Sequence, residues 1–311
     1  MVCRAAQAQS QAGPVPASTA PQPAQPEQLL PAPPPEPVKL VAPPPAATGS
    51  PFAVQLRIDL PVMLGSGAIA LGSELAKSEL PGPYCGLSCD PGSLNALDRT
   101  VVGNNSEVAR KVSDVFLGVN IGLPFALDLI DVLVNRSSDG MRGYGLDFLV
   151  LAEVLAVNAA LNNVVKFAVR RPRPLVYDPT QDEASRREPD AALSFYSGHS
   201  STSFSMATAY SYLFMLRHPG SKLIVPVWIL SEGMAAATAY LRVDAGKHFW
   251  TDVLTGALVG SALGVLIPYL HHRVMPKTLL TRLAGSGRNA LHWLAVPTMS
   301  TDGAGLLVTV Y

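Results

Sequence analysis

Long apolar stretches alternate with short polar ones from about residue 53 to residue 272 and predict a series of helices. The last stretch, Val253 to Leu270, has no charged residue and is long enough to cross a bilayer. Along it, three glycines recur every four residues and predict a smooth strip for close packing of another helix: Gly256, Gly260 and Gly264. The predicted helices cover residues 60–75, 112–134, 146–165, 200–216, 223–241 and 253–270. The core is therefore expected to be all-α, a bundle of about six helices.

Most of these helices carry polar side chains that lipid-facing positions tolerate badly, so we expect these side chains to face the bundle interior. The acidic ones include Asp114, Asp128, Asp131, Glu153 and Glu232. A soluble bundle resting on a membrane explains the acids about as well as a six-span membrane protein does, and hydropathy alone does not separate the two. We favour the membrane-embedded bundle.

The composition divides the chain into three parts. Residues 1–52 are rich in Pro, Ala and Gln, which predicts a disordered linker or tether. Residues 53–275 hold the helical bundle, and residues 276–311 form a C-terminal extension whose AGLLVTVY stretch suggests a short hairpin. Lys+Arg and Asp+Glu both number 23 and form no basic stripe, so nucleic acid is not expected as a partner. Nothing in the sequence indicates the oligomeric state.

Two of the three cysteines lie close together, in the segment PYCGLSCDPG. A turn rich in Gly and Pro brings Cys85 and Cys89 within bonding distance, and half of a zinc site is the alternative. Zinc needs two further ligands, and the nearby sequence offers no second pair of Cys or His. We therefore favour a disulfide and an oxidising compartment.

Three clusters of basic and histidine residues stand out from the apolar background, and the first is KFAVRRPRP. Lys166 closes a predicted helix, and Arg173 follows between two prolines that force the backbone out of helical geometry. Several cations therefore leave one helix end together. A basic collar at a membrane edge is the alternative interpretation, and for this cluster alone it is the favoured one.

The second cluster is SFYSGHSSTSF, in which Ser197, Gly198 and His199 directly precede a predicted helix. The start of a helix combines unpaired backbone N–H groups with the positive end of the helix dipole, and this combination binds anions. Simple N-capping by Ser197 or Ser200 is the alternative.

The third cluster is YLRVDAGKHFWTD, which contains Arg242, His248 and Asp252. The histidine and the aspartate lie four residues apart, so we expect them on one helix face with the carboxylate accepting a hydrogen bond from the imidazole. A core histidine with a capping partner and a metal pair are the alternatives, but Arg242 and Lys247 disfavour a metal ion.

Together the three clusters supply several cations, a backbone anion site, a nucleophile and a proton donor, which are the groups that phosphoryl transfer needs. Lys166, six residues and Arg173-Pro174 resemble the first signature of the type 2 phosphatidic acid phosphatase superfamily. Ser197-Gly198-His199 resembles the second signature. Arg242, five residues, His248, three residues and Asp252 resemble the third. The chain has Tyr196 where the family usually has Pro, and Leu241 where it usually has Ser, which leaves affinity and substrate choice open.

The resemblance implies a role for each signature residue. His248 attacks phosphorus and forms a phosphohistidine, His199 protonates the departing alcohol, and Asp252 orients His248. The phosphate is held by Lys166, Arg173, Ser197, Gly198 and Arg242. No cofactor and no metal ion are expected. Because the nucleophile must be neutral and the acid protonated, we expect the two imidazole pKa values to be pushed apart, with a bell-shaped pH profile.

The expected substrate is a phosphorylated lipid or a small phosphate ester, with a lipid-linked ester favoured by the apolar helices. The family topology and the predicted disulfide both place the site on the periplasmic or outer face of a membrane; a soluble periplasmic protein is the alternative. A vanadium-dependent haloperoxidase has a similar residue set, and a membrane protein that binds anions without catalysis is a third possibility. The charged segment 177–193 is expected to be a solvated surface connection.

Overall fold

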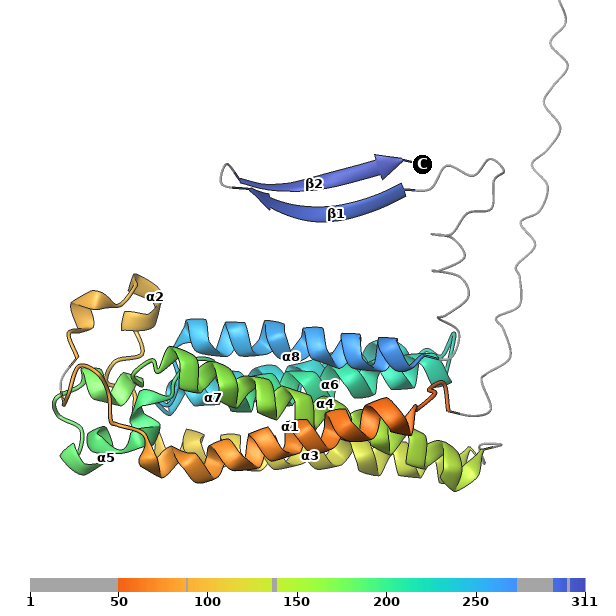
Figure 1. The fold of residues 1–311 in the computed structure, drawn as a ribbon, viewed down its shortest axis with the longest axis horizontal. Coiled ribbons are helices and arrows are strands. Elements are labelled where there is room, and N and C mark those ends of the chain that lie inside the picture. Colours follow the sequence, from red (N-terminus) through yellow and green to blue (C-terminus); the bar gives the residue numbers. More distant parts are fainter. Residues whose placement is uncertain (1–49, 88, 136–138, 273–292, 301–302, 311) are drawn as a thin grey trace, which may run out of the picture. The chain divides into compact units, whose positions relative to one another are not determined.

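The computed structural model describes residues 50–87, 89–135, 139–272, 293–300 and 303–310. Within these ranges, six long helices pack into a bundle (Figure 1). They are α1 (Leu56–Ala76), α3 (Glu107–Val134), α4 (Gly140–Val169), α6 (Gly198–Arg217), α7 (Ile224–Asp244) and α8 (Trp250–His271). The predicted all-α bundle is confirmed, and each predicted helix matches one of these.

Short helices lie in the connections between the long ones. They are η1 (Lys77–Glu79), η2 (Pro91–Ser93), α2 (Ala96–Arg99), η3 (Pro174–Tyr177), α5 (Glu183–Arg187) and η4 (Pro189–Ala192). Towards the C-terminus, β1 (Trp293–Ser300) pairs antiparallel with β2 (Gly303–Val310), so that Trp293 lies opposite Val310.

Residues 1–49 of the expected linker lie outside the described residues. Its last residues, however, pack on the bundle. Phe52 is fully buried, and the Ser50 hydroxyl donates a hydrogen bond of 2.6 Å to Asp147. The folded part therefore begins slightly before residue 53.

Helix α6 lies at the centre of the bundle, where it contacts α3, α4, α7 and α8. The glycine strip of α8 faces it. A Cβ atom added at Gly256 would lie 2.7 Å from the carbonyl oxygen of Ser197, and one at Gly264 would lie 2.6 Å from that of Ser205. Because any side chain there would collide with backbone, the glycines allow the start of α6 to lie directly against the start of α8.

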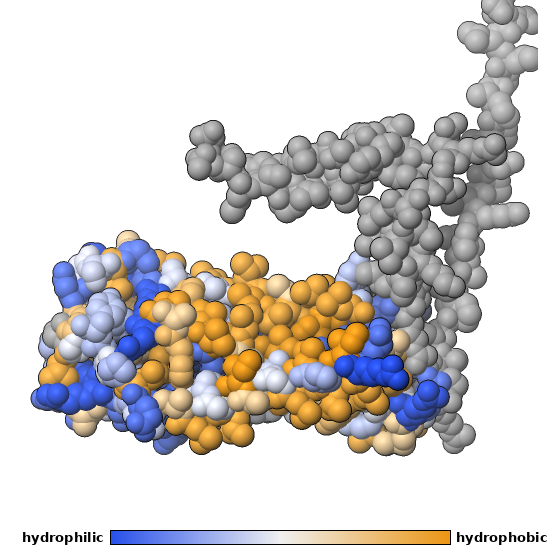
Figure 2. All heavy atoms as spheres, in the orientation of Figure 1, coloured by the Kyte–Doolittle hydropathy of each residue, from blue (hydrophilic) through white to orange (hydrophobic). Residues whose placement is uncertain are grey.

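Five helical segments are long and apolar enough to cross a membrane: Leu56–Glu79, Glu107–Val134, Gly140–Tyr177, Ile224–Asp244 and Trp250–His271. Helix α6 is not among them, because it carries several polar residues. Its central position suits the buried serines Ser200, Ser201, Ser203 and Ser205. Figure 2 shows hydrophobic residues along the middle of the bundle and hydrophilic ones at its ends. Outward-facing side chains such as Leu71 and Leu258 are mostly exposed. The chain is a membrane protein.

Candidate active site

The three motifs meet at one cavity of about 610 Å³. Six of the eight residues predicted for catalysis or phosphate binding line it: Lys166, Arg173, Gly198, His199, Arg242 and His248. Helix α1 contributes to one wall through Gly67, Ala70, Leu71 and Glu74, and Lys77 at the start of η1 continues that wall. Residues that lie up to 181 positions apart in sequence, from Gly67 to His248, therefore surround a single space that is rich in positive charge.

The first motif enters the cavity where α4 ends. Arg170 takes a left-handed backbone conformation (φ 49°) that terminates the helix, Pro172 prevents the helix from continuing, and Pro174 begins η3. Arg173 is then held by its own backbone, because its N–H donates to the carbonyl of Ala191 at 2.8 Å. Its guanidinium pairs with Asp190 at 2.8 Å.

Asp190 changes the interpretation of the segment 177–193. Burial alone would raise the pKa of this carboxyl, but Arg173 and Lys166 outweigh burial and hold the pKa below its ordinary value. Asp190 also lines the cavity, and the following residues Ala191, Ala192 and Leu193 are buried. The expected solvated connection is therefore wrong at its C-terminal end, which closes one side of the site.

The second motif forms the N-terminus of α6. The Ser197 hydroxyl accepts a hydrogen bond from the Ser200 N–H at 3.3 Å, and the Ser197 N–H donates to the Asp252 carbonyl at 3.1 Å. Ser197 thus caps the helix behind the cavity. Gly198 lies in front, where an added Cβ would be 2.9 Å from Asn162 Oδ1 and 3.5 Å from Lys166 Nζ. A side chain at this position would collide with Asn162, so glycine lets the start of α6 lie close to Asn162 and Lys166.

His199 follows on the same turn, and its Nε2 lies 2.8 Å from Asp114 Oδ1. The same carboxylate oxygen accepts from Arg242 Nη1 at 3.1 Å. Burial and the charge of Arg242 lower the pKa of His199 to about 4, although Asp114 acts in the opposite direction. In this environment the imidazole is neutral at pH 7.

His248 is 1% exposed, and its Nδ1 lies 2.8 Å from the carbonyl oxygen of Ser194. A carbonyl only accepts hydrogen bonds, so Nδ1 carries the proton and Nε2 keeps its lone pair. Burial, followed by the charges of Arg173 and Arg242, lowers the pKa of His248 well below its ordinary value. Both imidazole pKa values are therefore lowered, and the expectation that opposite environments push them apart is wrong for this arrangement of side chains.

The direct hydrogen bond expected from His248 to Asp252 is not formed, because His248 Nδ1 and Asp252 Oδ2 are 3.8 Å apart. The physical reason is the start of α8. Its first residue is Trp250, and Asp252 Oδ2 accepts a hydrogen bond from the Phe249 N–H at 3.0 Å. His248 therefore lies outside the helix, and the two side chains do not share a helix face. The same oxygen accepts from the Ser194 hydroxyl at 2.5 Å. Asp252 therefore contacts His248 mainly through Ser194.

Several partners of the site were not among the predicted site residues, although Arg171 lies within the first cluster, KFAVRRPRP. Arg171 binds Asp252 at 2.6 Å and Asp98 at 2.7 Å, and its guanidinium lies 4.3 Å from the centre of the Phe249 ring. Asn162 is the one residue that helical spacing could have found. It lies one turn before Lys166 and donates to the Tyr196 carbonyl at 2.8 Å.

At this end of the bundle, the structure pairs Cys85 with Cys89 in a disulfide with a Cα–Cα distance of 5.2 Å. The Cys89 N–H donates to the carbonyl of Val176, in the turn after the first motif, at 3.2 Å. The bridge therefore lies in a loop that packs against the segment carrying Arg173.

Residues 147–276 match the model of the PAP2 superfamily. All eight predicted site residues fall inside this range. This segment belongs to the PAP2 superfamily. The resemblance read from the three motifs is thus confirmed, while α1, α3 and Asp114 lie outside the matched range.

Two curated relatives show how far the similarity extends. Phospholipid phosphatase 2 of Rattus norvegicus is 34% identical over 136 residues, which cover 36% of this chain and 48% of the relative. A PA-phosphatase related-family protein of Dictyostelium discoideum is 26% identical over 161 residues, with 49% and 58% covered. The chain spans about half the length of the curated relatives it matches.

A transmembrane PAP2 type phosphatidylglycerolphosphate phosphatase from Bacillus subtilis, solved by crystallography, aligns with a TM-score of 0.42 at 20% sequence identity. The alignment covers 71% of this chain and 98% of the bacterial one.

Proposed function

We propose that this chain is a metal-independent phosphatase that hydrolyses a lipid-linked phosphomonoester or diphosphate through a phosphohistidine intermediate. One observation carries the proposal. The proton on His248 Nδ1 is fixed by the Ser194 carbonyl, so the lone pair of Nε2 is available in a cavity lined by Lys166, Arg173 and Arg242. A neutral nucleophile among cations suits attack on a phosphate.

The first half of the reaction transfers the phosphoryl group to the protein. Nε2 of His248 forms a bond to phosphorus while the bond from phosphorus to the alcohol oxygen breaks, and His199 gives its proton to that oxygen. Lys166, Arg173 and Arg242 balance the charge on the other phosphate oxygens. In the second half, water attacks phosphorus, gives a proton to His199, and releases phosphate from His248.

His199 must carry a proton for this reaction, although its pKa of about 4 keeps it neutral at pH 7 without substrate. A phosphate dianion in the cavity offsets the charge of Arg242 and attracts a proton, which raises the pKa of His199. We therefore infer that substrate binding itself charges the general acid. Asp114, at 2.8 Å, supports the charged form.

The shape of the cavity supports a lipid-linked substrate. Its α1 wall includes Gly67, Ala70 and Leu71, and Leu71 is 65% exposed on a helix that can cross a membrane. An acyl or prenyl chain lying along this wall would stay in the membrane while its phosphate reaches His248. Two of the curated relatives are named phospholipid phosphatases, which agrees with this choice.

We also propose that the site faces the periplasm or the cell exterior. The disulfide between Cys85 and Cys89 packs against the segment that carries Arg173, so both lie at the same end of the bundle. A disulfide persists in oxidising compartments. Labelling of a cysteine introduced at exposed Glu183 by a membrane-impermeant thiol reagent in intact cells checks the orientation.

Protein purified in detergent should release phosphate from a long-chain lipid phosphate faster than from a water-soluble monoester. Release should continue with a chelator present and should be inhibited by vanadate. Labelled phosphate trapped on the denatured protein should be labile to acid and stable to alkali, as expected for a phosphohistidine. Bromide oxidation with vanadate and peroxide, without phosphate release, would instead identify a haloperoxidase. Absence of both activities in folded protein would favour an anion-binding protein.

A further inference from the structure

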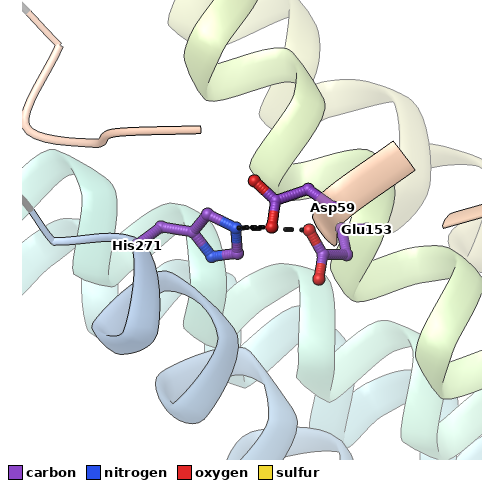
Figure 3. A group of neighbouring side chains, drawn as sticks. All are labelled: Asp59, Glu153 and His271. Atoms are coloured by element: carbon purple, nitrogen blue, oxygen red, sulfur yellow. Dashed lines mark ion pairs between the residues drawn. The ribbon is translucent and has the colours of Figure 1, made fainter. Parts of the chain in front are cut away.

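A second group of converging side chains lies at the opposite end of α8 from the cavity. Asp59 comes from the first turn of α1, Glu153 from the middle of α4, and His271 from the last turn of α8 (Figure 3). One ligand atom from each lies within 4.8 Å of the others. Because α8 rises by about 1.5 Å per residue, the group is about 30 Å from His248 and takes no part in the chemistry there.

All three side chains are buried. The exposed fractions of Asp59, Glu153 and His271 are 8%, 7% and 9%. Burying two carboxylates is costly unless a cation compensates their charge. A proton shared with the imidazole leaves one negative charge uncompensated within the group, whereas a divalent cation beside a neutral imidazole leaves none.

The imidazole of His271 is oriented as a ligand. Its Nδ1 lies 2.8 Å from the carbonyl oxygen of Ile267, which fixes the proton on Nδ1. In the neutral ring Nε2 therefore keeps its lone pair, and this atom faces both carboxylates (Figure 3). A backbone carbonyl that binds the outer ring nitrogen is a common feature of metal-binding histidines.

The distances within the group also fit a metal ion. His271 Nε2 lies 3.4 Å from Asp59 Oδ1 and 3.3 Å from Glu153 Oε2. Both are longer than the charge-assisted N–H···O bond of about 2.7–2.9 Å that an imidazolium would make. They match the separation of about 3.3–3.5 Å between two ligands of a tetrahedral ion whose bonds are about 2.0–2.2 Å long.

Asp59 is held in place from its other side. Its Oδ2 accepts a hydrogen bond of 2.5 Å from the Gln55 N–H just before α1, which leaves Oδ1 directed at His271. The neighbouring Ala53 N–H donates to the His271 carbonyl at 2.8 Å. The start of the bundle is therefore tied to the end of α8 at the same place.

We propose that Asp59, Glu153 and His271 bind one divalent transition-metal ion, Zn²⁺ or Mn²⁺, that joins α1, α4 and α8. One imidazole and two carboxylates suit these ions. The sequence did not predict this site, because its three residues lie far apart in the chain and form no motif. The ion acts on stability, since α1 packs chiefly on α4 and has few other contacts that hold it to the bundle.

Full-length protein in detergent, first treated with a chelator, tests the proposal when Zn²⁺ or Mn²⁺ is added. We expect one ion per chain by elemental analysis after desalting. Saturating ion should raise the thermal midpoint by about 5 °C or more. Co²⁺ should give the visible absorption of a low-symmetry site. Glu153→Gln should lose all three responses, and so should His271→Gln.

Glu232→Gln is the matched control, because Glu232 is another partly buried acid and bonds the Thr208 hydroxyl at 2.7 Å. It should keep the ion and the thermal shift. Wild-type protein that binds no ion and shows no shift would overturn the proposal and leave an ion-pair cluster. Binding that persists in both Glu153→Gln and His271→Gln would also overturn it, because the ion would then lie elsewhere.

Discussion

Two histidines, His248 just before α8 and His271 in its last turn, are oriented in the same way and surrounded in opposite ways. His248 Nδ1 and His271 Nδ1 each lie 2.8 Å from a backbone carbonyl, of Ser194 and Ile267 respectively. Around His248 stand Lys166, Arg173 and Arg242, whereas two carboxylates face the Nε2 of His271.

Ring orientation alone therefore does not decide what a buried imidazole does. In each case the carbonyl keeps the proton on Nδ1 and the lone pair on Nε2. Surrounding cations attract an anion to that lone pair, which suits a nucleophile for phosphate. Surrounding carboxylates attract a cation, which suits a metal ligand.

Replacing the two histidines should give the largest contrast. His248→Ala should lower kcat for phosphate release by about a thousandfold or more, because the nucleophile is lost. His271→Gln should retain most of the rate when both are measured well below the thermal midpoint of the variant. A His248→Ala protein that is folded and fully active would contradict the assignment of the nucleophile.

The cations around His248 should have the next largest effect. Arg173→Lys keeps the charge but loses the planar fork that pairs with Asp190 and faces the cavity, so kcat/KM should fall by about 10- to 100-fold. Arg187→Lys is the control, since Arg187 is exposed and pairs with Glu183 one helical turn away. Equal effects of the two variants would mean that Arg173 does not touch the phosphate.

The catalytic end could be predicted from the sequence because its motifs are local. Lys166 and Arg173 lie on one short segment, and His248 and Asp252 lie on another, so spacing alone indicates the chemistry. The helices were predictable for a similar reason, since each is a continuous apolar run. The contact between His248 and Asp252 was placed wrongly, because spacing does not reveal that α8 begins at Trp250. The burial of Asp190 beside the cavity and the lowering of both imidazole pKa values were missed as well, because both depend on how distant segments pack.

The other end of the bundle could not be predicted in this way. Asp59, Glu153 and His271 are single residues on three helices, and none forms a motif with its sequence neighbours. Asp114 and Asp98 were not predicted as partners of the site for the same reason, although Asp114 was expected to face the bundle interior. Such contacts depend on how the helices pack, and one sequence does not show the packing.

The support of His248 through Ser194 gives a smaller expected effect. Ser194→Ala removes the hydroxyl that donates to Asp252 at 2.5 Å but keeps the carbonyl that binds His248. The imidazole should stay in its tautomer but be held less firmly, so kcat should fall about three- to tenfold with KM nearly unchanged. A loss as large as that of His248→Ala would mean that the hydroxyl contacts the substrate.

The smallest expected effect is on the pH dependence of kcat. Two Asp–His pairs allow a matched test, each with its aspartate on α3 and its histidine at one end of α6. Asp114 lies 2.8 Å from His199 beside the cavity, and Asp131 lies 2.9 Å from His218 at the other end. Asp114 raises the pKa of His199 against burial and Arg242. Because His199 acts in its protonated form, kcat should fall as the pH rises through its pKa in the substrate complex.

Asp114→Asn removes the group that raises this pKa, so the alkaline limb of the kcat profile should move to lower pH. The acidic limb reports the deprotonation of His248 and should stay nearly in place, which narrows the bell. Asp131→Asn should leave both limbs unchanged, since its partner His218 lies far from the phosphate. A shift of the alkaline limb to higher pH would reverse the sign and show that Asp114 acts on the site in some way other than through the charge of His199.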